Sequence, residues 1–295
     1  MKKKLKNILF ILMLLGGVGI LLYPDIASWY NARNQEGVIQ RFHESVAGIS
    51  QEEIEEHFRR ARQYNDLLTG IAITDPFVVG SGAVIPAPDY LDILYVDGVM
   101  GQIEIPAIGV LLPIFHTTDY EVLNRGVGHI EGTSFPVGGE GSHAVLTGHS
   151  GLPHARMFTD LEEMVLGDVF FIRVLNYTMA YQIEDINTVL PYEIESLRVS
   201  QEADFVTLIT CTPYGINSHR LLLRGIRIPY VPDMEDEIEY ILADNINWRW
   251  VILAIFATLF IIIFIIRMIR KRNDRRDPIS QFKETVIQII SDDES

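Results

Sequence analysis

The only cysteine of the chain, Cys211, ends the apolar, β-branched run FVTLITC and stands directly before Thr212-Pro213. A proline cannot donate a ladder hydrogen bond, so strand pairing should stop there. A side chain at a strand end can reach a cleft, whereas a side chain in mid-strand would lie in the core. A single cysteine cannot form an internal disulfide, which leaves an inert buried thiol, an intermolecular bridge or a nucleophile.

A return strand would bring a positive charge to this thiol. Eight residues, TPYGINSH, separate Cys211 from Arg220, and Pro213, Gly215 and Asn217 among them are turn formers. The run RLLLRGIRI then alternates as a strand. If the two strands pair antiparallel, Arg220 lies close to Cys211, where a guanidinium can favour the thiolate or donate to an oxyanion. The alternative is an ordinary surface arginine on a strand.

A thiol nucleophile also needs a group that accepts and returns a proton, most often histidine. His149, in HAVLTGHSG, ends an apolar run before a turn of small residues, which mirrors the placement of Cys211. His143 and His219 are weaker candidates. The serine-hydrolase pattern G-x-S-x-G fails in Gly148–Leu152 at its last position. No CxxC or HExxH pattern and no EF-hand spacing occurs, so we expect neither a metal nor a cofactor.

Both ends of the chain predict membrane segments. The basic start MKKKLK precedes the apolar residues 8–23, and residues 248–266 begin with two tryptophans and lead into a basic cluster. The second segment has the ~20 residues of a spanning helix, with its basic flank on the cytoplasmic side. The first could be a signal peptide, but no clear cleavage site follows it, so we favour an uncleaved anchor.

The segment between them would lie outside the cell and is strongly acidic. Residues 24–247 contain 12 lysines and arginines, all of them arginines, against 33 aspartates and glutamates. This balance argues against a nucleic-acid partner. It suits a solubilising surface, or attraction to a basic partner.

Composition and periodicity also predict how the chain is organised. Residues 31–68 have helical spacing, residues 69–89 are a loop rich in glycine and proline, and short strands recur from 99 to 230. Such strands favour a sandwich or a barrel. We expect a basic cytoplasmic tail (1–7), an anchor (8–23), a helical arm (24–68), a loop (69–89), a β domain (90–232), a linker helix (233–247), a transmembrane helix (248–266) and a cytoplasmic tail (267–295).

The residues around the candidate site resemble a known family. TLITC, residues 207–211, resembles the TLxTC signature of sortases, the cysteine transpeptidases of Gram-positive cell surfaces. The resemblance continues through TPYGINSHRLLLRG, GVGHIEGTSFPVGG and AVLTGHSGLPHARMFTDLEEMVLGD. Together with YPDIASWYNARNQ and the second membrane segment, it points to the class C branch, which polymerises pilins.

This resemblance implies a fold and a reaction. The fold is mostly β, an eight-stranded β-barrel with N-terminal helices, flanked here by two transmembrane helices. Cys211 matches the nucleophile, His149 the catalytic histidine and Arg220 the catalytic arginine, and the neighbouring Thr210 and Thr212 are expected to contact substrate. The reaction cleaves an LPxTG-like sorting signal between Thr and Gly through a thioester, which a lysine of the next pilin subunit resolves. The implied place is the Gram-positive cell membrane, with the catalytic domain outside.

The stretch Asp75-Pro76-Phe77 resembles the lid of class C sortases. There the aspartate meets the catalytic arginine, and an aromatic residue covers the cysteine and histidine. An Asp–Arg pair would occupy the donors that substrate needs, so we expect an autoinhibiting plug within the loop 69–89. The plain alternative is an ordinary proline turn.

Two other functions are compatible with parts of this pattern. A sortase that anchors proteins to the cell wall would use a peptidoglycan amine as acceptor, but the two membrane segments and the DPF stretch argue against it. A pilus-assembly scaffold without activity would have no need for Cys211, His149 and Arg220 together.

Overall fold

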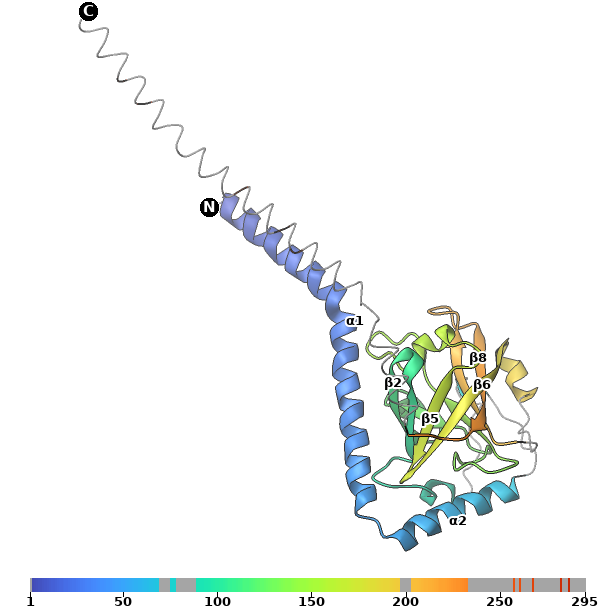
Figure 1. Ribbon diagram of the computed structural model, residues 1–295. Helices are drawn as coiled ribbons and strands as arrows, with labels where there is room; N and C mark the ends of the chain where they lie inside the picture. Colours follow the sequence, from blue (N-terminus) through green and yellow to red (C-terminus); the bar gives the residue numbers. More distant parts are fainter. Residues whose placement is uncertain are drawn as a thin grey trace, which may run out of the picture. The chain divides into compact units, whose positions relative to one another are not determined.

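The computed structural model describes residues 2–68, 75–77, 89–196 and 203–232, with isolated positions from 257 onward (Figure 1). The chain divides into two compact units, Met1–Leu242 and Ala243–Ser295, and nearly all described residues belong to the first. The predicted linker helix, second membrane segment and C-terminal tail therefore lie outside the described residues, apart from those isolated positions, as does most of the loop 69–89.

Two helices precede the β domain, α1 (Lys2–Ala47) and α2 (Gln51–Leu67). The break between them is set by Ser50, whose hydroxyl accepts from the Glu53 amide while the Glu53 carboxylate accepts from the Ser50 amide. This capping box satisfies donors that a new helix leaves unpaired. The predicted helices are confirmed, with an interruption at 48–50. Among the described residues, no helix combines the length and the hydropathy that a membrane span requires.

Eight strands close into a barrel in the order β1-β2-β3-β4-β7-β8-β6-β5, which confirms the predicted eight-stranded barrel. The β2–β3 and β4–β7 pairs are parallel and all others are antiparallel. The strands are β1 (Gly101–Ile105), β2 (Val110–His116), β3 (Val127–His129), β4 (His143–Thr147), β5 (Val169–Val174), β6 (Tyr177–Val189), β7 (Phe205–Thr212) and β8 (His219–Ile228).

Short helical turns fill the connections between the strands. The loop before β3 contains the single-turn helix α3 (Tyr120–Leu123), and the connection from β4 to β5 contains the 3₁₀ turn η3 (Thr159–Glu163). The other 3₁₀ turns are η1 (Tyr90–Asp92), η2 (Pro106–Ile108) and η4 (Pro191–Ser196).

The two faces of the β7–β8 pair pack in two different hydrophobic clusters. Because side chains alternate along a strand, Val206 and Leu208 of β7 join the main hydrophobic core. Ile209 of β7 and Leu222 of β8 belong to a second, smaller cluster, against which Phe77 packs. The opposite face of this pair is thus the surface that residues 75–77 cover, and it also holds Cys211.

Candidate active site

Cys211 and Arg220 are direct cross-strand partners in the β7–β8 pair. The antiparallel pairing predicted from the eight-residue loop is confirmed. Residues opposite each other in such a pair point to the same face and have neighbouring side chains. One detail differs from the prediction: β7 ends at Thr212 rather than at Cys211, because Thr212 still pairs with His219 before Pro213 interrupts the ladder.

His149 reaches the same end of the barrel through the parallel pair β4–β7. Thr147 of β4 is in register with Ile209 of β7, and His149 follows Thr147 by two residues as Cys211 follows Ile209. Two hydrogen bonds hold this end together: the Gly148 amide donates to the Ile209 carbonyl at 3.1 Å, and the Thr210 hydroxyl donates to the Gly148 carbonyl at 2.8 Å. The pairing of β4 with β7 therefore fixes the histidine beside the cysteine strand.

The loop after β4 is packed too tightly for a side chain at residue 148. A Cβ at Gly148 would come within 2.8 Å of the Phe158 ring. The Phe158 amide in turn donates to the His149 carbonyl at 3.0 Å. The glycine at residue 148 thus lets the fully buried Phe158 ring pack against the loop that carries His149.

Asp75 forms a bidentate ion pair with Arg220. The Nε–Oδ1 and Nη2–Oδ2 distances are 3.1 and 2.8 Å, and each side chain is only 6% exposed. The remaining terminal nitrogen, Nη1, donates to the backbone carbonyls of Asn217 and His219. Each of the three guanidinium nitrogens is therefore engaged within the protein, and Asp75 holds two of them, Nε and Nη2.

The Phe77 ring lies against Arg220 and His149. The Arg220 guanidinium carbon is 5.1 Å from the Phe77 ring centroid, and the His149 ring centroid is 5.7 Å from it. The Phe77 amide donates to Asp75 Oδ1, so the turn through Pro76 holds the carboxylate and the ring as one unit. The segment 75–77 thus places the predicted lid residues directly on the candidate catalytic residues.

Burial and charge set the protonation of this closed arrangement. Burial raises the pKa of Cys211 to about 11, and the Asp75 carboxylate adds to that rise while Arg220 opposes it. Burial also lowers the pKa of His149, with a smaller contribution from His154. The pair is consequently a thiol and a neutral imidazole near pH 7. Within the described part of the chain, His149 Nε2 is buried without a hydrogen-bond partner.

The two threonines expected to contact substrate are engaged inside the protein. Thr210 is fully buried on the face opposite to Cys211, where its hydroxyl donates to Gly148. The Thr212 hydroxyl donates to Glu162. Their contact with substrate stays a prediction, and Thr210 has a visible structural task in positioning the histidine loop.

The other candidate histidines are placed differently. His143 begins β4, at the far end of that strand from His149, and hydrogen-bonds Thr207 at 2.8 Å; burial lowers its pKa to about 4. His219 contacts the Ser218 hydroxyl and pairs with Thr212. Tyr120, which no sequence motif marks as a site residue, has an exposed ring that meets the His149 ring edge-on, with centroids 6.5 Å apart. No spacing in the sequence links these two residues.

Comparisons with known proteins agree with this geometry. A family model described as "Sortase domain" matches residues 103–228, which include Cys211, His149 and Arg220. The solved structure of Streptococcus agalactiae sortase C1 is 45% identical, covers 67% of this chain and 97% of its own, and has a TM-score of 0.61. The chain belongs to the sortase family. This sortase is a class C cysteine transpeptidase.

Two further relatives match this sortase at different levels of sequence identity. Sortase C-1 from Actinomyces oris is 47% identical, with 61% of this chain and 99% of that chain covered and a TM-score of 0.58. Sortase D of Bacillus subtilis is 28% identical over 131 residues, which are 43% of this chain. The match spans 63% of that curated relative, less than two thirds of its length.

Proposed function

We propose that this sortase joins pilin subunits by transpeptidation at Cys211. The observation that carries the proposal is the convergence of Cys211, Arg220 and His149 at one end of the β4–β7–β8 sheet. A solved relative, 44% identical, is described as "Sortase C1 of GBS Pilus Island 1", which supports a pilin substrate. The expected partners are pilin subunits that carry an LPxTG-like signal and an acceptor lysine.

The first step forms a thioester. Cys211 Sγ attacks the carbonyl carbon of the signal's Thr, and its proton passes to His149. The carbonyl oxygen becomes an oxyanion, to which the Arg220 guanidinium donates hydrogen bonds once Asp75 has left. The bond between that carbon and the Gly nitrogen breaks, and His149 returns the proton to the departing amine.

The second step transfers the acyl group. A lysine amine of another pilin attacks the thioester carbon, and His149 takes the proton that the amine loses. The C–S bond breaks and Cys211 leaves as the thiol or thiolate, so the products are an isopeptide bond and the regenerated enzyme. A single histidine can serve both steps because it is neutral when the second amine arrives.

Residues 75–77 gate this reaction. Asp75 occupies two Arg220 nitrogens, and the Phe77 ring lies against Arg220 and His149. Substrate carbonyl and lid carboxylate compete for the same donors, so the lid must leave before the oxyanion can be held. A substrate or partner that favours the open arrangement would therefore activate the enzyme.

The enzyme would act from the cell membrane, with its barrel outside. This part of the proposal rests on the sequence alone: the apolar residues 8–23 and 248–266, each flanked by basic residues at the chain ends. Both pilin signals and acceptor lysines would then meet the barrel on the outer side.

Mass spectrometry of the enzyme after incubation with an LPxTG-bearing pilin tests the proposal. We expect a mass increase on Cys211 equal to the pilin truncated after Thr less one water, and its loss on addition of a lysine-bearing acceptor pilin. Cys211→Ala should show no adduct. An adduct that survives in Cys211→Ala, or one that only water resolves, would contradict the proposal.

A further inference from the structure

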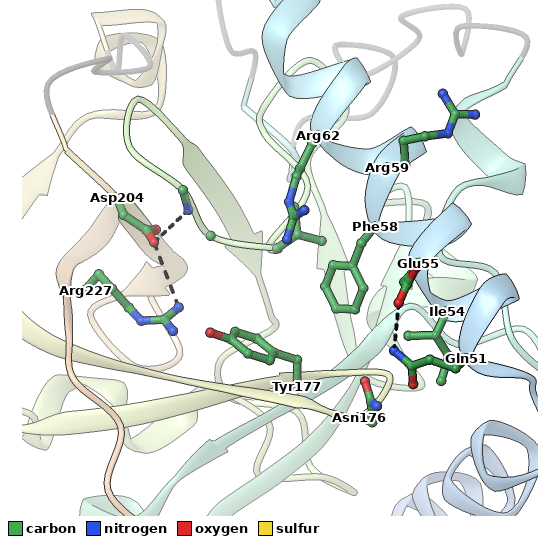
Figure 2. A pocket seen from close by; sticks show the side chains of 13 residues that line it. Gln51, Ile54, Glu55, Phe58, Arg59, Arg62, Asn176, Tyr177, Asp204 and Arg227 are labelled. Carbon is green, nitrogen blue, oxygen red and sulfur yellow. Dashed lines mark hydrogen bonds and ion pairs between the residues drawn. The ribbon is translucent and has the colours of Figure 1, made fainter.

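A groove lies at the other end of the β7–β8 pair from Cys211. The groove, of about 870 Å³, is formed between α2, the β5–β6 turn and the end of β8 (Figure 2). A smaller hollow of about 620 Å³ shares Asn176, Tyr177 and Arg227 with it. Arg227 follows Arg220 by seven residues along β8, so at ~3.3 Å per residue the groove is about 23 Å from the catalytic arginine.

Two aromatic rings form the wall where the helix meets the barrel. Phe58 of α2 and Tyr177 of β6 meet edge-on, with ring centroids 6.1 Å apart. Tyr177 is 52% exposed although it belongs to a barrel strand. Figure 2 shows both rings turned toward the groove. This gives the groove an apolar surface that a side chain of a bound molecule can cover.

Two arginines, one from α2 and one from β8, lie on aromatic rings, and neither has a carboxylate closer than 3.9 Å among the described residues. The Arg62 guanidinium lies 5.6 Å from the Phe58 ring centroid, and among the described residues no carboxylate pairs with it. Arg227 lies 5.9 and 5.5 Å from the rings of Tyr177 and Tyr181. A cation held on a ring face keeps its N–H donors available for an anion.

The ion pair between Asp204 and Arg227 is long. The only ion pair of Arg227 among the described residues is to Asp204 at 3.9 Å, at the outer limit for such a contact. That carboxylate already accepts from Tyr181 Oη and the Gly139 amide, each at 2.9 Å, and from Ser142 Oγ at 3.3 Å. Asp204 therefore holds the loop that contains Gly139 and Ser142, and Arg227 can still bind a second anion.

We propose that this groove binds an extended acidic segment of a partner protein, with carboxylates at Arg62 and Arg227 and an apolar side chain on Phe58 and Tyr177. Positive charge is scarce in this part of the chain: residues 24–247 hold 12 arginines against 33 acidic residues. Three of those arginines, Arg59, Arg62 and Arg227, line the groove, against two acidic residues, Glu55 and Asp204.

The groove's other polar groups favour a peptide over a polyphosphate. Gln51 and Asn176 present side-chain amides, which pair with peptide N–H and C=O groups. Glu55 and Asp204 also line the groove and would repel a dense run of phosphates. A peptide that carries only two or three carboxylates can place them at the arginines and keep apolar residues elsewhere.

Fluorescence anisotropy on the full chain in detergent tests the inference. The probe is a fluorescein-labelled peptide, Gly-Glu-Ala-Phe-Glu-Ala-Gly, and its twin has glutamine in place of both glutamates. We expect Arg62→Gln or Arg227→Gln to weaken binding by at least about threefold each, and the twin to bind correspondingly less well. The matched control is Arg33→Gln, since Arg33 also lies on an aromatic ring, Trp29 at 5.6 Å, away from the groove.

Four outcomes would overturn the inference. Equal binding of the glutamine twin would remove the role of charge, and an equal loss in Arg33→Gln would show general attraction. Stronger competition by short-chain polyphosphate than by unlabelled peptide would identify a polyanion site. Self-association of the chain that Arg62→Gln abolishes would assign the groove to a second copy. Cleavage of a short sorting-signal peptide by Arg62→Gln at the wild-type rate shows that the variant is folded.

Discussion

The carboxylate of Asp75 and the guanidinium of Arg220, 145 residues apart in sequence, form a buried bidentate ion pair across the candidate active site. A buried pair of this kind is retained only when both charges are satisfied. Here the Phe77 amide completes the carboxylate and two backbone carbonyls complete the guanidinium. The closed arrangement is therefore self-sufficient, and substrate must replace it group for group.

Asp75→Ala should activate the enzyme toward small substrates. The substitution removes two charge-assisted hydrogen bonds, each contributing about 1.5–3 kcal/mol, from the closed arrangement and none from the open one. We expect hydrolysis of a fluorogenic LPxTG peptide to rise by about tenfold or more. Asp66→Asn, an exposed carboxylate on α2, is the control and should be silent. An unchanged rate in Asp75→Ala would remove the lid from the mechanism.

The same substitution should make Cys211 more acidic. Burial and the Asp75 carboxylate both raise the pKa of Cys211, whereas Arg220 lowers it. Removing Asp75 leaves the lowering influence and admits water, so the pKa falls from about 11 toward the ordinary thiol range. Alkylation by iodoacetamide, followed from about pH 6 to about pH 11, reports this as a midpoint at lower pH. Cys211→Ala checks that the signal is this thiol, and a midpoint that does not move would contradict the assignment.

The β7–β8 part of the site could be predicted because its contacts are local in sequence. Alternation fixes the faces of the two strands and the eight-residue loop fixes their register, so the Cys211–Arg220 pair follows. The place of Thr210 followed as well. Because side chains alternate along a strand, Thr210 must point to the face opposite to Cys211. Its expected contact with substrate came only from the family signature.

The rest of the site depends on contacts that a strand pattern does not reveal. His149 reaches Cys211 through the parallel β4–β7 pair, whose register no turn specifies. Asp75 was linked to Arg220 only through family resemblance, because nothing in a Gly- and Pro-rich loop encodes its distant partner. Strand β3, Val127–His129, is three residues long and too short to show a period.

Gly148→Ala should disable the histidine without touching any reacting atom. The added methyl group would lie 2.8 Å from the Phe158 ring, and overpacking of this kind costs about 1–3 kcal/mol. We expect a lower Tm and a drop in kcat, because the loop that carries His149 must shift. Gly37→Ala, in α1 and open to a methyl group, is the control.

A double-variant cycle checks the cause of the Gly148→Ala effect. Phe158→Leu removes the ring that the methyl group would strike, at the cost of a cavity. If the clash is the cause, Gly148→Ala should lose less stability in the Phe158→Leu background than in the wild type. Additive losses in urea unfolding would show that the glycine matters for another reason.

Asn65→Ala should loosen the start of the lid. The Asn65 amide donates to the Phe135 carbonyl at 3.1 Å and accepts from the Phe135 amide at 2.7 Å, which ties the end of α2 to the barrel just before the loop 69–89. Loss of both bonds leaves backbone groups unpaired at a cost of about 1–3 kcal/mol, or roughly 3–8 °C in Tm. Peptide hydrolysis should rise as well, because Asp75 is then held less firmly against Arg220. Asn187→Ala, which removes only an exposed contact with Asp185, should change neither Tm nor rate. A fall in Tm without a rise in hydrolysis would restrict Asn65 to a structural role.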